Sequence, residues 1–418
     1  MTVRALGLCL GAVFSLASAV RAQAPDVELH GFVDFGATAR VVADPLRPAD
    51  LLLSEVRFQL DLSHYGERAE GAFKGDVTSD GVTDDVDVDI RHAAITIRAT
   101  DWLDVRAGRQ VLTWGTGDLV FLNDLFPKDF VSFFVGRDDE YLKAPATALK
   151  ATFYTSFLNL DVVATPVFEP DRSITGERLS FFDAQRGELV SAASAPPPAQ
   201  PSRPARELRN GELALRAFWT LSGYEFALYG YTGFTKQPLA SDSQGGPPSH
   251  SRLAAYGASA RGSLMGGIAH VETAYYDGSD DVGDSPSIPN SQVRALVGYT
   301  RELMPDLTGG LQYYAEHTLD HDRMVAASSR PDLEPSETRH VVTTRLAYRL
   351  LRQTLTVSVF AFVSPNDGDV HLRPTLAHDW SDGFGVTAGA NVMLGDDHTF
   401  FGQLSGGSNV YLRGRYSF

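Results

Sequence analysis

The stretch VELHGFVDFGATARV, residues 27–41, alternates apolar and polar side chains along most of its length. Successive side chains of a β-strand point to opposite faces, so a period of two predicts a strand whose two faces meet different surroundings. The same alternation returns in residues 56–62, 213–219, 293–299, 386–392 and 410–418. No segment keeps the 3.6-residue period of an amphipathic helix, so we expect an all-β protein.

The strands and their connections favour a transmembrane barrel over a soluble β-sandwich. Several alternating stretches reach about ten residues, which is longer than the usual strand of a soluble sheet. Tight links separate them at residues 63–66, 100–102, 155–156, 221–223, 264–265, 304–306, 351–352 and 380–383. Longer polar stretches lie between these links, as in transmembrane barrels with short periplasmic turns and long extracellular loops. The breaks predict a single antiparallel β-barrel of about 18 strands, with 16 as the alternative.

Composition excludes two other classes of protein. The 418 residues include 36 Lys and Arg against 52 Asp and Glu, a net charge of -16, so no basic excess exists to neutralise nucleic-acid phosphates. The mean hydropathy is -0.12, and outside the N-terminus no apolar run approaches the roughly 20 residues of a membrane-spanning helix. A value near zero suits a barrel, because the lipid-facing and lumen-facing residues of each strand cancel.

The N-terminus predicts export from the cytoplasm. Residues 1–22 have the charged start, apolar core and small-residue end of a secretory signal peptide, with cleavage expected after Ala22 and cleavage after Ala24 as the alternative. The single cysteine, Cys9, lies inside this segment. The mature chain, residues 23–418, therefore has no disulfide to stabilise it.

Three motifs carry a resemblance to a known family. The terminal NVYLRGRYSF, residues 409–418, resembles the last strand that the barrel assembly machinery recognises in Gram-negative outer-membrane proteins, with Tyr416 and Phe418 as the assembly signal. The run LDVRAGRQVLTWGTGD, residues 103–118, is similar to the strand that leads into the constriction loop of porin-like families, and FGQL at 401–404 also looks porin-like. The resemblance implies a barrel in the cell outer membrane, in contact with membrane lipid and lipopolysaccharide.

Two connections differ from ordinary polar loops. Residues 115–145 carry many large apolar side chains that need a surface to pack on, ten of them between residues 119 and 134, so we expect this segment to fold into the barrel as a constriction loop. Its acidic residues are Asp118, Asp124, Asp129, Asp138, Asp139 and Glu140. Residues 168–207 are rich in Pro and Ala and have no periodicity, which predicts a mobile extracellular loop.

The lumen-facing phase of the later strands is mainly basic. It contains Arg294, Arg345, Arg349, Arg373, Arg413 and Arg415, and barrel closure would join these strands to the first one. An acidic loop opposite this basic wall would create a transverse field that tunes ion selectivity. The alternative is that the arginines pair with neighbouring carboxylates and only stiffen the barrel.

No group of residues predicts an enzyme, a metal site or a cofactor. The acids and histidine at 320–322 lie in a polar loop, and no HExxH motif or complete nucleotide-binding fingerprint is present. We therefore expect a porin for passive diffusion of small hydrophilic solutes, with a preference for anions left open. The alternative is a duct for a hydrophobic or lipidic substrate, or a partner barrel for a periplasmic transport system. A homo-oligomer is a further open possibility for its assembly.

Overall fold

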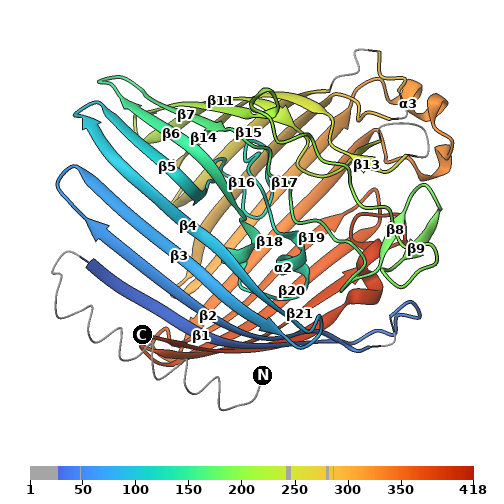
Figure 1. Ribbon diagram of the computed structural model, residues 1–418, viewed down its shortest axis with the longest axis horizontal. Helices are drawn as coiled ribbons and strands as arrows, with labels where there is room; N and C mark the ends of the chain where they lie inside the picture. The colour runs from blue at the N-terminus through green and yellow to red at the C-terminus, as the bar shows by residue number, and fades with distance from the viewer. Residues whose placement is uncertain (1–26, 48, 242–245, 279–281, 286) are drawn as a thin grey trace.

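The structure, a computed structural model, shows a closed barrel. It describes residues 27–47, 49–241, 246–278, 282–285 and 287–418. The predicted signal peptide lies outside the described residues. Eighteen strands pair in one antiparallel sheet, and the ladder between β1 (Val27–Arg40) and β22 (Asn409–Ser417) closes it (Figure 1). The prediction of an all-β antiparallel barrel is confirmed, with eighteen strands rather than sixteen.

The remaining wall strands follow one another in chain order. They are β2 (Leu51–Tyr65), β3 (Ala69–Asp80), β4 (Asp85–Thr100), β5 (Leu103–Val111), β6 (Pro145–Tyr154), β7 (Asn159–Thr165), β10 (Glu212–Leu221), β11 (Tyr224–Phe234), β14 (Arg252–Leu264), β15 (Gly267–Gly278), β16 (Gln292–Met304), β17 (Leu307–Thr318), β18 (Thr338–Leu350), β19 (Leu355–Ser364), β20 (Asp369–Ser381) and β21 (Phe384–Leu394). Each pairs with its neighbours in sequence, so the barrel is an uninterrupted meander.

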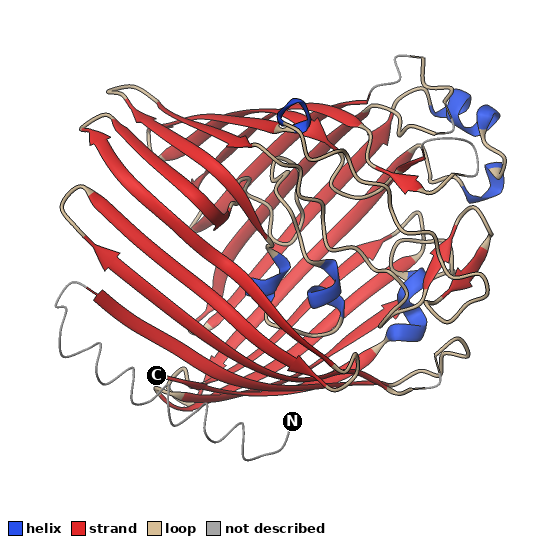
Figure 2. Cartoon of the chain, viewed as in Figure 1, coloured by secondary structure: helices blue, strands red, loops and turns tan. Residues whose placement is uncertain are grey.

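Short elements occupy the loops between the wall strands (Figure 2). They are the hairpins β8 (Phe181–Asp183) with β9 (Glu188–Val190) and β12 (Ala240–Ser241) with β13 (Pro248–Ser249), the helices α2 (Phe130–Phe134) and α3 (His321–Ala327), and the 3-10 turns η1 (Asp139–Leu142), η2 (Leu208–Asn210), η3 (Pro331–Leu333) and η4 (Gly402–Gly407). Within the described residues, no helix is both long and apolar enough to span a membrane.

The two ends of the barrel differ in their connections. At one end every connection is two to four residues long, and at the other end the long loops gather, on the right of Figure 1. Ser222–Gly223 and Met265–Gly266 have positive φ at both positions, as two-residue hairpin turns of type I′ require. Two connections at the long-loop end, residues 81–84 and 365–368, are only four residues long, because their flanking strands continue further.

The period-two pattern places apolar side chains on the outer face of the barrel. Val88, Leu311 and Leu412 are 58% to 65% exposed there. Trp102 and Trp380 lie at or beside short turns, at the end of the barrel that also holds Val27 and Phe418, and they stack on Phe153 and Phe384. Exposed apolar strands edged by aromatic residues match the surface that a barrel presents to lipid.

Candidate pore constriction

The β5–β6 loop, residues 112–144, lies inside the barrel rather than outside it. Its first arm, residues 113–127, contacts β11, β15, β17 and β18. Its second arm, residues 128–144, contacts β1, β2, β4 and β20 to β22. The predicted constriction segment therefore packs along much of the inner wall.

The first arm is anchored by a wall carboxylate, Glu272 of β15. This side chain is fully buried. Its Oε2 accepts hydrogen bonds from the backbone N–H of Thr116 at 2.7 Å and from the Thr116 hydroxyl at 3.0 Å. Its Oε1 accepts two more, both at 2.9 Å, from the backbone N–H and the side-chain amide of Asn123. One carboxylate thus closes the turn formed by residues 116–123, here called the inner turn.

The inner turn brings a predicted loop acid to a predicted wall arginine. Asp118 and Arg345 form a two-bond ion pair, with Nε and one terminal nitrogen 2.6 and 2.9 Å from the carboxylate oxygens. Gln312 of β17 accepts from the Asp118 backbone N–H at 2.7 Å and donates to its carbonyl at 2.9 Å. The ion pair is part-exposed, which suits a group at the edge of a water-filled space.

The second arm carries the other loop-to-wall ion pairs. Asp138 lies 2.8 Å from Arg413 and 3.4 Å from Arg415, and Asp139 lies 2.8 Å from Arg373. Glu140 is 3.5 Å from Arg415. Burial alone would raise the pKa of Asp138, but the arginines Arg413 and Arg415 hold that pKa below its usual value. Loop acids and wall arginines are therefore in direct contact, not separated by an open gap.

Beside these pairs, the second arm joins a buried charge network that sequence reasoning did not assign to the site. Arg137 lies 2.5 Å from Glu55, which also binds Arg57 at 2.8 Å. Arg57 in turn contacts Asp76 at 2.7 Å, and the Tyr141 ring lies 4.1 Å from the Arg57 guanidinium. The strand periodicity puts Glu55, Arg57 and Asp76 on the lumen side, but it gives no sign that they bind the loop.

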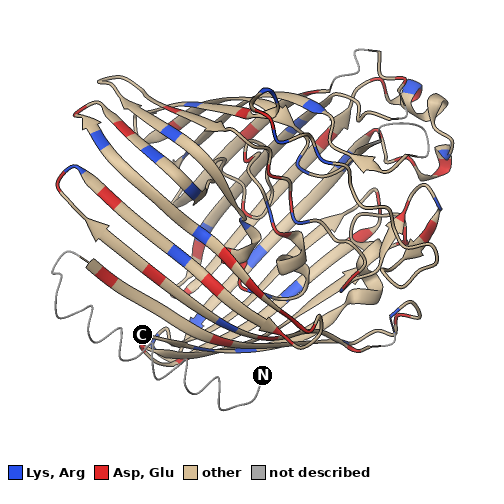
Figure 3. Ribbon diagram, in the orientation of Figure 1, with Lys and Arg blue, Asp and Glu red and all other residues tan. Residues whose placement is uncertain are grey.

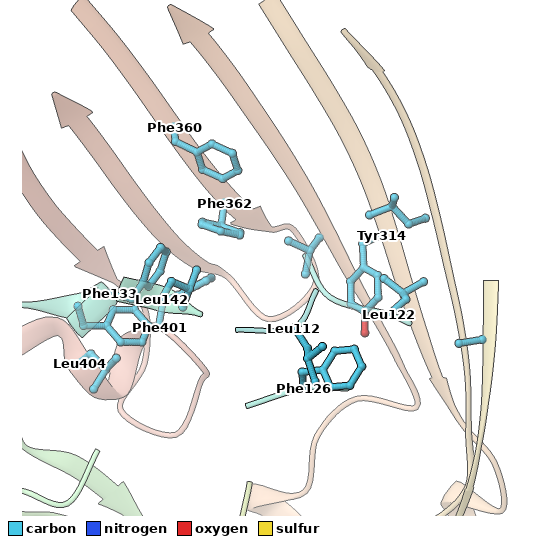
Figure 4. Close-up of a cluster of buried hydrophobic side chains, with 14 of the residues drawn as sticks. Leu112, Leu122, Phe126, Phe133, Leu142, Tyr314, Phe360, Phe362, Phe401 and Leu404 are labelled. Carbon is cyan, nitrogen blue, oxygen red and sulfur yellow. The ribbon is translucent and has the colours of Figure 1, made fainter. Parts of the chain in front are cut away.

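Apolar contacts fix both arms as well. Figure 4 shows one group around Phe133, Leu142, Phe401 and Leu404, and a second group of Leu112, Leu122, Phe126 and Tyr314. The loop thus buries the apolar side chains that made it unsuitable as a solvated loop, and the molecule has its main hydrophobic core here, inside the barrel.

Other predicted site residues lie elsewhere. Asp124 binds Lys128 at 3.0 Å within the loop. Asp129 caps α2 and lies 3.3 Å from Arg172 of the β7–β10 loop. Arg294 pairs with Glu316 on the neighbouring strand at 3.1 Å.

Arg349 of β18 has no ion pair among the described residues.

The last strand, β22, closes the barrel. The backbone N–H of Phe418 donates to Gly31, and its ring stacks on Phe58. Tyr416 pairs with Val33 in the closing ladder. The roles of Tyr416 and Phe418 as an assembly signal stay predictions.

The β7–β10 loop, residues 166–211, crosses the long-loop end. Leu179 is 1% exposed and would be struck by a Cβ added at Gly407, so it packs against η4. Arg178 lies 2.7 Å from Asp80 of β3. Asp171 accepts from the backbone N–H of Lys128 at 2.7 Å. The loop is thus anchored to η4, to β3 and to the inserted β5–β6 loop, and the mobility expected for residues 168–207 stays a prediction.

Within the described residues, no group of three or more His, Cys, Asp or Glu side chains could hold a metal ion. Charged side chains instead line the strands and the inserted loop (Figure 3).

A closed eighteen-stranded barrel with an inserted loop is the fold of the porin-like barrels of Gram-negative outer membranes, as the sequence resemblance implied. Similar solved structures include OccAB3 of Acinetobacter baumannii, with 12% identity, a TM-score of 0.55, and 94% of this chain and 100% of that chain covered. OccD3 (OpdP) of Pseudomonas aeruginosa has 13% identity, a TM-score of 0.54 and coverages of 94% and 91%. At these identities the likeness concerns the fold. No protein-family model and no curated protein matches the sequence.

Proposed function

We propose that the chain is an outer-membrane channel through which small hydrophilic solutes diffuse passively. The observation that carries this proposal is that the β5–β6 loop is tied to the wall on two sides, by Asp118–Arg345 and by Asp138–Arg413. A loop held along the wall narrows a lumen, whereas a plug would fill it. Charged side chains that remain part-exposed inside a barrel require water around them.

The proposed solutes include anions. Glu225 of β11 pairs with Arg216 at 2.8 Å. Arg261 lies opposite Glu225 in the register of β11 with β14, so two arginines lie near one carboxylate that pairs with Arg216. Among the described residues, Arg349 and Arg106 have no carboxylate within ion-pair distance. An excess of unpaired positive charge along a pore lowers the barrier for anions.

A duct for a hydrophobic substrate remains the second candidate. It is favoured by the first arm, whose Leu119, Val120, Phe121 and Leu125 are only partly buried against the core. Apolar surface left inside a barrel could guide a nonpolar molecule.

The location and partners follow from the proposed class. We place the barrel in the outer membrane with its short turns toward the periplasm, surrounded by lipid and lipopolysaccharide. Recording the purified protein in a planar bilayer tests the proposal, with a steady open-channel current as the expected result. A protein that inserts but conducts no ions favours the duct.

A further inference from the structure

Glu272 is an unusual charge in this barrel. Its side chain is fully buried on β15, yet no Lys, Arg or His of the described chain lies within ion-pair distance of it. Removing a carboxylate from water without a counter-charge is costly unless hydrogen bonds replace the lost hydration. Here four donors do so, and all four belong to Thr116 and Asn123 of the inner turn.

The two carboxylate oxygens of Glu272 bind different residues. Oε2 binds only Thr116, and Oε1 binds only Asn123. These residues are the two ends of the inner turn. A single wall side chain therefore holds both ends together and attaches them to β15.

The backbone around Glu272 lies so close to the inner turn that two positions there tolerate only glycine. Gly115 has φ +81°, and a Cβ there would lie 2.9 Å from Oε1 of Glu272. On the neighbouring strand β14, a Cβ at Gly257 would lie 1.7 Å from the side-chain oxygen of Asn123. Both positions require glycine because the inner turn approaches the wall so closely.

The inner turn carries Asp118, whose carboxylate meets Arg345. We propose that Glu272 is a positioning residue that clamps the inner turn to the barrel wall and so sets where Asp118 meets Arg345 in the constriction. This inference rests on the proposed channel function. Glu272 would act through the loop, without contacting the solute.

Two substitutions separate the clamp from the charge. In Glu272→Gln, the amide keeps one acceptor oxygen but points an NH2 group at donors, and it removes the negative charge. In Glu272→Asp, the charge remains while the side chain becomes one methylene shorter and cannot reach both ends of the turn. If Glu272 holds the inner turn in place, both substitutions impair its function. If only its negative charge matters, Glu272→Gln alone has an effect.

The experiment is single-channel recording of the native protein, the two Glu272 variants and Glu225→Gln. Glu225 is the matched control because it is a lumen-side carboxylate paired with Arg216 away from the loop. We expect both Glu272 variants to enter closed or sub-conductance states more often, with an occupancy shift of roughly tenfold, as the loss of hydrogen bonds to a buried charge implies. Glu225→Gln should alter ion preference without adding closures.

Two results would overturn the clamp: native-like gating in both Glu272 variants, or altered behaviour in Glu272→Gln alone. Should either variant fail to form the heat-modifiable barrel on gels, Thr116→Val with Asn123→Ala replaces it, since this pair removes only side-chain donors. Unchanged gating in that double variant also overturns the clamp. A native protein that conducts no current contradicts the channel function instead, so the two failures are distinguishable.

Discussion

The two arms of the β5–β6 loop are held to the wall by different physics. The second arm joins a buried network in which Arg57 and Asp76 are 7% and 0% exposed at their side chains. The first arm relies on hydrogen bonds to Glu272 and on an ion pair, Asp118–Arg345, whose side chains are 44% and 36% exposed. Breaking a buried charge pair leaves an uncompensated charge, whereas a part-exposed pair is largely replaced by water. The second arm should therefore be the fixed support, and the first arm the part that can move.

The largest expected effect comes from Arg57→Ala. It leaves the Asp76 carboxylate buried without a guanidinium, while Glu55 keeps Arg137, and we expect this to cost about 3–5 kcal/mol of unfolding free energy. Urea unfolding of the folded barrel in detergent measures this. A loss below about 1 kcal/mol would mean that the network is not the main support of the second arm.

A smaller effect is expected from Gly257→Ala. The added Cβ meets the Asn123 side chain and should push the first arm off the wall, at a cost of about 1–3 kcal/mol. Gly230→Ala is the matched control, since the nearest atom to its Cβ would be 4.0 Å away. Equal unfolding midpoints for the two variants would contradict the tight contact between Asn123 and β14.

Arg345→Gln should change selectivity more than stability. Because the ion pair with Asp118 is part-exposed, we expect a stability loss below about 1 kcal/mol. Removing the positive charge should shift the reversal potential in a salt gradient toward cations. Neutralising Arg294, Arg345 and Arg373 together should enlarge this shift, with most of it coming from Arg345 and Arg373, since Arg294 pairs with Glu316. An unchanged reversal potential in the triple variant would mean that the basic wall does not set the ion selectivity of the pore.

The smallest effect concerns the contact between the β7–β10 loop and the inserted β5–β6 loop, where Asp171 accepts from the backbone N–H of Lys128. Burial raises the pKa of Asp171 to about 6. A folded-state pKa above the unfolded value favours the protonated form, so this contribution to stability is complete below about pH 4 and is lost as the pH rises through about 6. We expect Asp171→Asn to slow proteolysis of residues 166–211 at neutral pH, compared with the native protein at the same pH. Equal cleavage rates at neutral and acidic pH in both proteins would show that Asp171 does not stabilise the contact between the two loops.

The sequence predicts the wall better than the loop. Period-two alternation specifies which face of a strand is polar, so a count of about 18 strands and the lumen side of Arg345 could be predicted. The ion-pair partners of these residues could not be predicted from the sequence, because Asp118 reaches Arg345 only through the path of the loop. Asp129 illustrates the limit: it is the N-cap of α2 and accepts from the backbone N–H of Ser132, and that role takes it away from the wall.

The most direct test of the central claim is ionic current through the native protein in a planar bilayer with a salt gradient. The account predicts a stable open-channel current whose reversal potential is displaced toward that of the anion. Insertion into the bilayer without any open-channel current would contradict it.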